Sequence, residues 1–142
     1  MWRLYLLGGC AVALGGCTVT PGVAPAGTRY DGVYAGQDTL VSGAAFQCGA
    51  PDLPESIRLR DGRFEYPFQV SPPRVAPLPV DVAADGSMAG QMQYGTGEEI
   101  PALSRDRIDW VRLSGRISGT TMDATITTLR CVRRLTAQRS GD

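Results

Sequence analysis

The stretch Ile57-Arg58-Leu59-Arg60-Asp61-Gly62-Arg63-Phe64-Glu65-Tyr66 decides the fold of this chain. Apolar and charged residues alternate on both sides of Asp61-Gly62, as in strands that have one face in a core and the other in water. Asp-Gly between two such segments favours a tight hairpin turn, because Gly readily adopts the positive φ that the turn requires. The stretch therefore predicts a β-hairpin.

The same device of a turn residue, a glycine and a large apolar residue two positions later recurs along the chain. It begins at Asp31, Asp85 and Ser114, and each of these copies has a second glycine four residues after the first. With side chains alternating along a strand, the bulky residue then stands between two gaps on one face. Such gaps suit a tightly curved sheet, in which another backbone approaches closely.

Further strands are predicted over residues 34–41, 80–82, 87–94, 108–118, 122–129 and 130–139, and no stretch after the N-terminal segment has helical periodicity over ten residues. Residues 67–79 contain five prolines and are predicted to be a loop, as are residues 94–104. We therefore predict an all-β fold, a small antiparallel meander of about eight strands. The meander closes as a β-barrel or, alternatively, folds as a β-sandwich.

The N-terminus has the pattern of a secretory signal: Arg3, an apolar run to Leu14, then small residues. Leu14-Gly15-Gly16-Cys17 resembles a bacterial lipobox, which implies cleavage before Cys17 and a diacylglycerol on its thiol. We expect a lipoprotein signal peptide over residues 1–16, a flexible tether over 17–28, a β-domain over 29–139 and a C-terminal tail over 140–142. The alternatives are a soluble secreted protein, cleaved after Ala26, and a cytosolic protein.

The cysteine count bears on the same question. Cys10 lies inside the signal and is lost with it, which leaves Cys17, Cys48 and Cys131. Because three is an odd number, one of these cysteines needs another fate, and acylation of Cys17 supplies it. We therefore predict a disulfide between Cys48 and Cys131, which requires an oxidising compartment.

Composition argues against several classes of function. All 14 basic residues are Arg, and the chain contains no Lys, His or Asn. Without His, the usual general base at neutral pH and the commonest metal ligand are both missing. We therefore predict that the protein is not an enzyme and has no metal or cofactor. Its 14 acidic residues balance the arginines, so we expect no nucleic-acid partner.

The densest charge cluster lies near the C-terminus and comprises Arg130, Arg133, Arg134 and Arg139. The favoured interpretation is an edge strand protected by charged side chains. The alternative is a site for an anionic partner at the mouth of a barrel. The aromatic residues Phe64, Tyr66, Phe68, Tyr94 and Trp110 are predicted to belong to the core.

The combination of a lipobox, a short tether, Asp-Gly hairpins and a long-range cysteine pair is similar to small envelope lipoproteins of proteobacteria. Some outer-membrane lipoproteins of this size are β-barrels that inhibit proteases. The resemblance implies a non-enzymatic binding or structural module, anchored by lipid on the periplasmic side of the outer membrane, with an envelope protein as partner. Thr18 after Cys17 favours the outer membrane. The alternative function is a carrier of a small apolar ligand inside the barrel.

Overall fold

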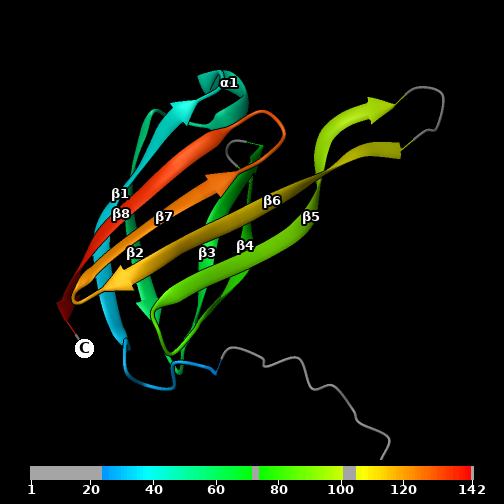
Figure 1. Ribbon diagram of the computed structural model, residues 1–142. Helices are drawn as coiled ribbons and strands as arrows, with labels where there is room; N and C mark the ends of the chain where they lie inside the picture. The colour runs from blue at the N-terminus through cyan, green and yellow to red at the C-terminus, as the bar shows by residue number, and fades with distance from the viewer. Residues whose placement is uncertain (1–23, 72–73, 101–104, 142) are drawn as a thin grey trace, which may run out of the picture.

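The computed structural model describes residues 24–71, 74–100 and 105–141. The predicted signal peptide over residues 1–16, Cys17 and the first part of the predicted tether lie outside these residues. The described chain forms one antiparallel sheet of eight strands and one short helix. The sheet curls into a nearly closed barrel (Figure 1), so the prediction of an all-β barrel is confirmed.

The strands follow one another around the barrel in the order β2-β1-β8-β7-β6-β5-β4-β3. The N-terminal strand β1 therefore lies between β2 and the C-terminal strand β8. The bounds of the elements are β1 Gly32–Ser42, α1 Ala45–Cys48, β2 Asp52–Leu59, β3 Arg63–Ser71, β4 Arg74–Val82, β5 Ser87–Ile100, β6 Arg105–Ser118, β7 Thr121–Thr127 and β8 Val132–Gly141.

The Asp-Gly turn between β2 and β3 is formed as predicted. Asp61 and Gly62 both have positive φ, 50° and 72°, and Arg60 and Arg63 exchange backbone hydrogen bonds of 3.0 and 2.9 Å. Beyond this bridge no hydrogen-bonded ladder joins the described residues of β2 and β3. The two strands are the ends of the sheet, and the barrel has a seam between them.

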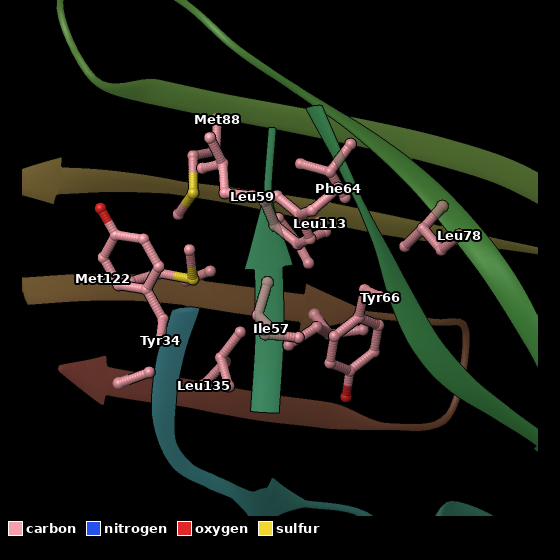
Figure 2. Packing of buried hydrophobic residues seen from close by; sticks show 14 of the residues in the cluster. Tyr34, Ile57, Leu59, Phe64, Tyr66, Leu78, Met88, Leu113, Met122 and Leu135 are labelled. Carbon is pink, nitrogen blue, oxygen red and sulfur yellow. The ribbon is translucent and has the colours of Figure 1, made fainter. Parts of the chain in front are cut away.

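Side chains close the seam from inside. Figure 2 shows Ile57 and Leu59 of β2 in the same interior as Phe64 and Tyr66 of β3. The largest fully buried side chains of the interior come from β1, β2, β4, β6, β7 and β8: Tyr34, Ile57, Leu59, Leu78, Leu113, Ile117, Met122, Ile126 and Leu135. Apolar burial holds the barrel closed where backbone hydrogen bonds do not.

Two glycines allow the tight curvature that the repeated Gly pattern predicts. A Cβ on Gly36 would lie 2.0 Å from the carbonyl oxygen of Thr136 in β8, and one on Gly115 would lie 2.2 Å from that of Asp123 in β7. Neither position can accept a side chain without moving the neighbouring backbone. The close approach of strands at these glycines is confirmed.

The prediction of a loop over residues 67–79 is wrong for residues 67–71, which belong to β3, and for residues 74–79, which belong to β4; residues 72 and 73 lie outside the described residues. Pro67 lies opposite Pro77, and Pro79 lies opposite Glu65. Proline fits where its side of the strand needs no N–H donor. That condition holds here because β3 faces the seam, and β4 pairs with β5 over only two residue pairs.

The prediction of a long connection over residues 94–104 is wrong for residues 94–100, which belong to β5; residues 101–104 lie outside the described residues. β5 and β6 continue past the barrel wall as a two-stranded arm, which projects beyond the other strands in Figure 1. The register shifts between Gly95 and Glu99, where the expected loop residues form an irregularity within the hairpin.

The two ends of the described chain lie at the barrel end opposite α1 (Figure 1). Residues 24–28, the last part of the predicted tether, lie against the β4–β5 turn, where Ala26 N donates to Val82 O at 3.1 Å and Ala84 N donates to Ala24 O at 2.9 Å. At the other terminus β8 includes Ser140 and Gly141, which were expected to be tail residues.

Candidate functional site

Arg133, one of the four arginines near the C-terminus, lies inside the barrel. It belongs to β8, which pairs with β1 on one side and with β7 on the other. The interpretation of residues 130–139 as an edge strand is therefore wrong. Side chains alternate along β8, and Arg133 shares the inner face with Leu135 and Ala137, with only 5% of its surface exposed.

Asp38 of β1 neutralises this buried guanidinium. Arg133 Nε donates to Asp38 Oδ1 at 2.8 Å, and Arg133 Nη2 donates to the Asp38 carbonyl oxygen at 3.1 Å. The Tyr66 hydroxyl donates to the second carboxylate oxygen, Asp38 Oδ2. Asp38 is fully buried, so its charge depends on these partners rather than on water.

The predicted disulfide is present and lies beside this ion pair. Cys48 and Cys131 are joined with their Cα atoms 5.7 Å apart, which links α1 to the start of β8. Arg133 Nη1 donates to the Cys48 carbonyl oxygen at 2.9 Å. The disulfide, α1 and the buried ion pair therefore close one end of the barrel as a single unit.

Two other titratable groups of this unit have shifted pKa values. Burial raises the pKa of Glu55 to about 7, and the nearby Asp38 carboxylate adds to the shift, whereas Arg133 opposes it. Burial is also the main reason why the pKa of the Tyr66 phenol lies above its usual value, and Asp38 is the next cause. Arg133 thus interacts electrostatically with two carboxylates, Asp38 and Glu55. Of these, Glu55 has a raised pKa, which means that the folded protein disfavours its charged form.

An enclosed cavity of about 30 Å³ lies beside these groups, lined by Tyr66, Phe68, Gln69 and Tyr94 among others. A volume of this size holds about one water molecule. The Arg133, Asp38 and Tyr66 side chains direct their hydrogen bonds inward, to one another and to the Cys48 carbonyl oxygen.

The structure does not bring the four arginines together. Arg134 is on the outer face, where it forms an ion pair of 2.6 Å with Asp123. Arg130 lies in the connection between β7 and β8, and Arg139 lies six residues after Arg133, about 20 Å farther along the strand. These positions face different surroundings and do not form one anion site.

Sequence reasoning missed both Asp38 and Tyr66 as partners of Arg133. A signal was available for Asp38, because alternation from Tyr34 through Gly36 puts it on the inner face of β1. An acidic residue on a core-facing position requires a buried cation or donor. The identity of that cation depends on strand register, which alternation alone does not reveal.

A surface of another kind lies at the same end of the barrel. Among the described residues six large apolar side chains are exposed, and the order and direction of the elements put all of them toward the end that carries α1. We call this surface the apolar end; its members are Val41, Phe46, Val75, Ile108, Trp110 and Leu129. Phe46 is 82% exposed and Trp110 45%, so the prediction that Trp110 belongs to the core is wrong.

Comparison with protein-family models, with curated proteins and with solved structures finds no significant match to this chain. Among the described residues, no cluster of three side chains could hold a metal ion. None of the helices in that part of the chain has the length and apolar character needed to cross a membrane.

Proposed function

We propose that this protein is a lipid-anchored lipoprotein of the bacterial envelope whose barrel, without catalytic activity, binds another envelope protein through the apolar end. The observation that carries the binding role is that the six large hydrophobic side chains exposed among the described residues all lie toward one end of the barrel. Exposed apolar patches on a soluble domain mark sites of interaction, and aromatic residues such as Trp110 and Phe46 are typical anchors there.

The anchor is supported by the lipobox residues before Cys17 and by the disulfide, since a disulfide between Cys48 and Cys131 needs an oxidising compartment. The direction of the chain agrees with this function. Residue 24 lies at the end opposite α1, so a membrane anchor on Cys17 would leave the apolar end directed away from its own membrane. We place the protein on the periplasmic side of the outer membrane, because Thr18 follows Cys17.

The alternative of an apolar-ligand carrier receives less support. A carrier needs an internal space of several hundred Å³. The enclosed cavity at the α1 end measures about 30 Å³, and the barrel interior is occupied by buried side chains such as Leu113 and Met122. Binding at the surface therefore explains the geometry better than binding inside.

The anchor is tested by the intact mass of the protein extracted from membranes, compared with a Cys17→Ala variant. We expect an acylated chain that begins at Cys17 and lacks two hydrogens because of the disulfide. The Cys17→Ala variant should lose the lipid mass. A native mass that begins at Gly27 would overturn the anchor.

The binding role is tested by cross-linking intact envelopes that contain wild-type protein or the Phe46→Ser/Leu129→Ser variant. We expect a discrete cross-linked partner that the variant loses. Ala35→Ser, an exposed change on the outer wall, is the matched control and should keep the partner. An equal pattern in all three proteins, or no partner, would overturn binding through the apolar end. Assays of the purified domain against a panel of proteases test the narrower role of protease inhibitor.

A further inference from the structure

The seam between β2 and β3 is a second feature of the surface, distinct from the apolar end. Arg60 and Arg63 are bridged through their backbones, and beyond them the strands diverge without a ladder (Figure 2). Each strand therefore presents backbone groups along an unpaired edge. Unpaired edges are the places where an extended segment of another chain adds as a strand.

Backbone alternation shows which amides face the seam. Because Arg60 N and Arg63 N both donate across it, every second residue from them points the same way: Ser56 and Arg58 on β2 and Glu65 on β3. The next members of these rows are Pro54 and Pro67, which have no N–H. The prolines and the bridge thus limit the available edge of β2 to residues 56–58.

A groove with a volume of about 810 Å³ follows this edge. Three arginines line it, Arg58 and Arg60 from β2 and Arg63 from β3. Arg63 is paired with Asp81 at 2.9 Å, whereas Arg58 and Arg60 form no ion pair with any described residue. Glu65 and Asp81 also line the groove, so its unpaired positive charge is confined to the β2 side, where Arg58 and Arg60 have no ion-pair partner in the described part of the chain.

The gap between β4 and β5 lacks these properties. β4 forms ladder pairs with β5 only at Asp81 and Val82, although Gly90 of β5 lies close to Pro79 of β4. Pro77 and Pro79 lie on this part of β4, and neither can donate to an added strand. The β2–β3 seam and the β4–β5 gap thus differ in whether their backbone N–H groups can pair with an added strand.

We propose that the β2–β3 groove binds an extended acidic segment of a partner protein, which pairs with residues 56–58 of β2. A strand added there places its outward side chains beside Arg58 and Arg60, and cross-strand pairs of opposite charge stabilise such an arrangement. Backbone hydrogen bonds supply affinity and the two arginines supply selectivity for carboxylates. This inference rests on the proposed function only in taking the partner to be a protein.

The test uses the purified disulfide-bonded domain and a labelled ten-residue peptide of alternating Glu and Val. We expect binding by fluorescence anisotropy and slower hydrogen exchange at the Ser56 and Arg58 amides. Affinity should fall about tenfold in Arg58→Glu/Arg60→Glu, and should be unchanged in the matched control Arg112→Glu/Arg116→Glu, which lies on β6. A peptide of alternating Arg and Val should bind the wild-type domain no more tightly than the acidic peptide binds the Arg58→Glu/Arg60→Glu variant.

No binding of the acidic peptide at millimolar concentration overturns the proposal. Equal binding of the Arg-Val peptide, or binding without protection of Ser56 and Arg58, also overturns it. The Phe46→Ser/Leu129→Ser variant separates the two proposals, because it should lose the envelope partner and still bind the acidic peptide. If the acidic peptide does not bind the groove but the envelope partner is still cross-linked through the apolar end, the proposed function is unaffected.

Discussion

Arg133 and Arg134 are neighbours on β8, yet they lie on opposite sides of the barrel wall. The Arg133–Asp38 pair has an N–O distance of 2.8 Å and side chains that are 6% and 1% exposed. The Arg134–Asp123 pair is shorter, at 2.6 Å, but its side chains are 59% and 46% exposed. The contact distance therefore does not show which pair contributes more to stability.

The difference lies in what replaces a lost partner. If Asp123 is removed, water solvates Arg134. If Asp38 is removed, Arg133 keeps its charge inside the barrel, where the remaining contacts are the Asp38 and Cys48 carbonyl oxygens. Burial, rather than geometry, should decide how much each pair matters for stability.

The largest expected effect comes from Asp38→Ala. It should lower the free energy of unfolding by about 3 to 5 kcal/mol, because it leaves a buried cation without its counter-ion. Urea unfolding followed by circular dichroism measures the loss. The double variant Asp38→Leu/Arg133→Met should recover most of the stability. A single variant as stable as the wild type would show that water reaches Arg133.

The next largest loss of stability is expected from removal of the disulfide, which links α1 to the start of β8 beside the ion pair. Replacing both Cys48 and Cys131 by Ser should cost about 2 to 5 kcal/mol, because the unfolded chain regains the freedom of a long closed loop. The midpoint of urea unfolding, compared with that of the wild-type protein with and without a reductant, measures this cost. If the double Ser variant and the reduced wild-type protein differ, the reductant affects more than this bond.

Glu55 makes the stability of the buried side of the barrel wall depend on pH. Its pKa is raised to about 7 in the folded protein from an ordinary value of 4.5, so the fold retains a proton that the unfolded chain releases. The contribution of Glu55 is fully present below about pH 4.5 and is lost as the pH rises to about 7. Glu55→Gln should remove this loss and stabilise the protein by about 1 to 2 kcal/mol at pH 8, allowing for its partial exposure.

Urea unfolding at pH 4 and pH 8 measures the effect of Glu55→Gln. We expect the two proteins to be closest in stability at pH 4 and to separate as the pH rises. A variant that is destabilised equally at both values would mean that the Glu55 carboxyl is held by favourable contacts instead.

The smallest effect is expected outside the barrel. Arg134→Ala should leave the free energy of unfolding almost unchanged, because the exposed pair with Asp123 competes with solvation. Added salt should reduce the change further. Thermal unfolding in buffers of low and high ionic strength is the measurement. A loss as large as that of Asp38→Ala would remove the distinction between the two sides of the wall.

The hairpin, the glycine gaps and the disulfide could be predicted because each depends on a local pattern or on cysteine parity. The prolines of β3 and β4 misled the prediction, since proline is excluded only where its side of the strand is paired. The pairing of Arg133 with Asp38 joins β1 to β8, and sequence patterns do not give the register between them. Trp110 lies on the outer face of β6 just beyond the end of β7, a position that composition does not reveal.

The position of β8 between β1 and β7 has a consequence for the order of events during folding. Tyr34 of β1 pairs with Arg139 of β8, so the eighth strand fills the gap between the first strand and the seventh. Until β8 is synthesised, two inner strands lack a neighbour, and the buried Asp38 lacks its cation. Contacts between such distant segments slow folding. The sheet therefore stays open between β1 and β7 until β8 has been synthesised.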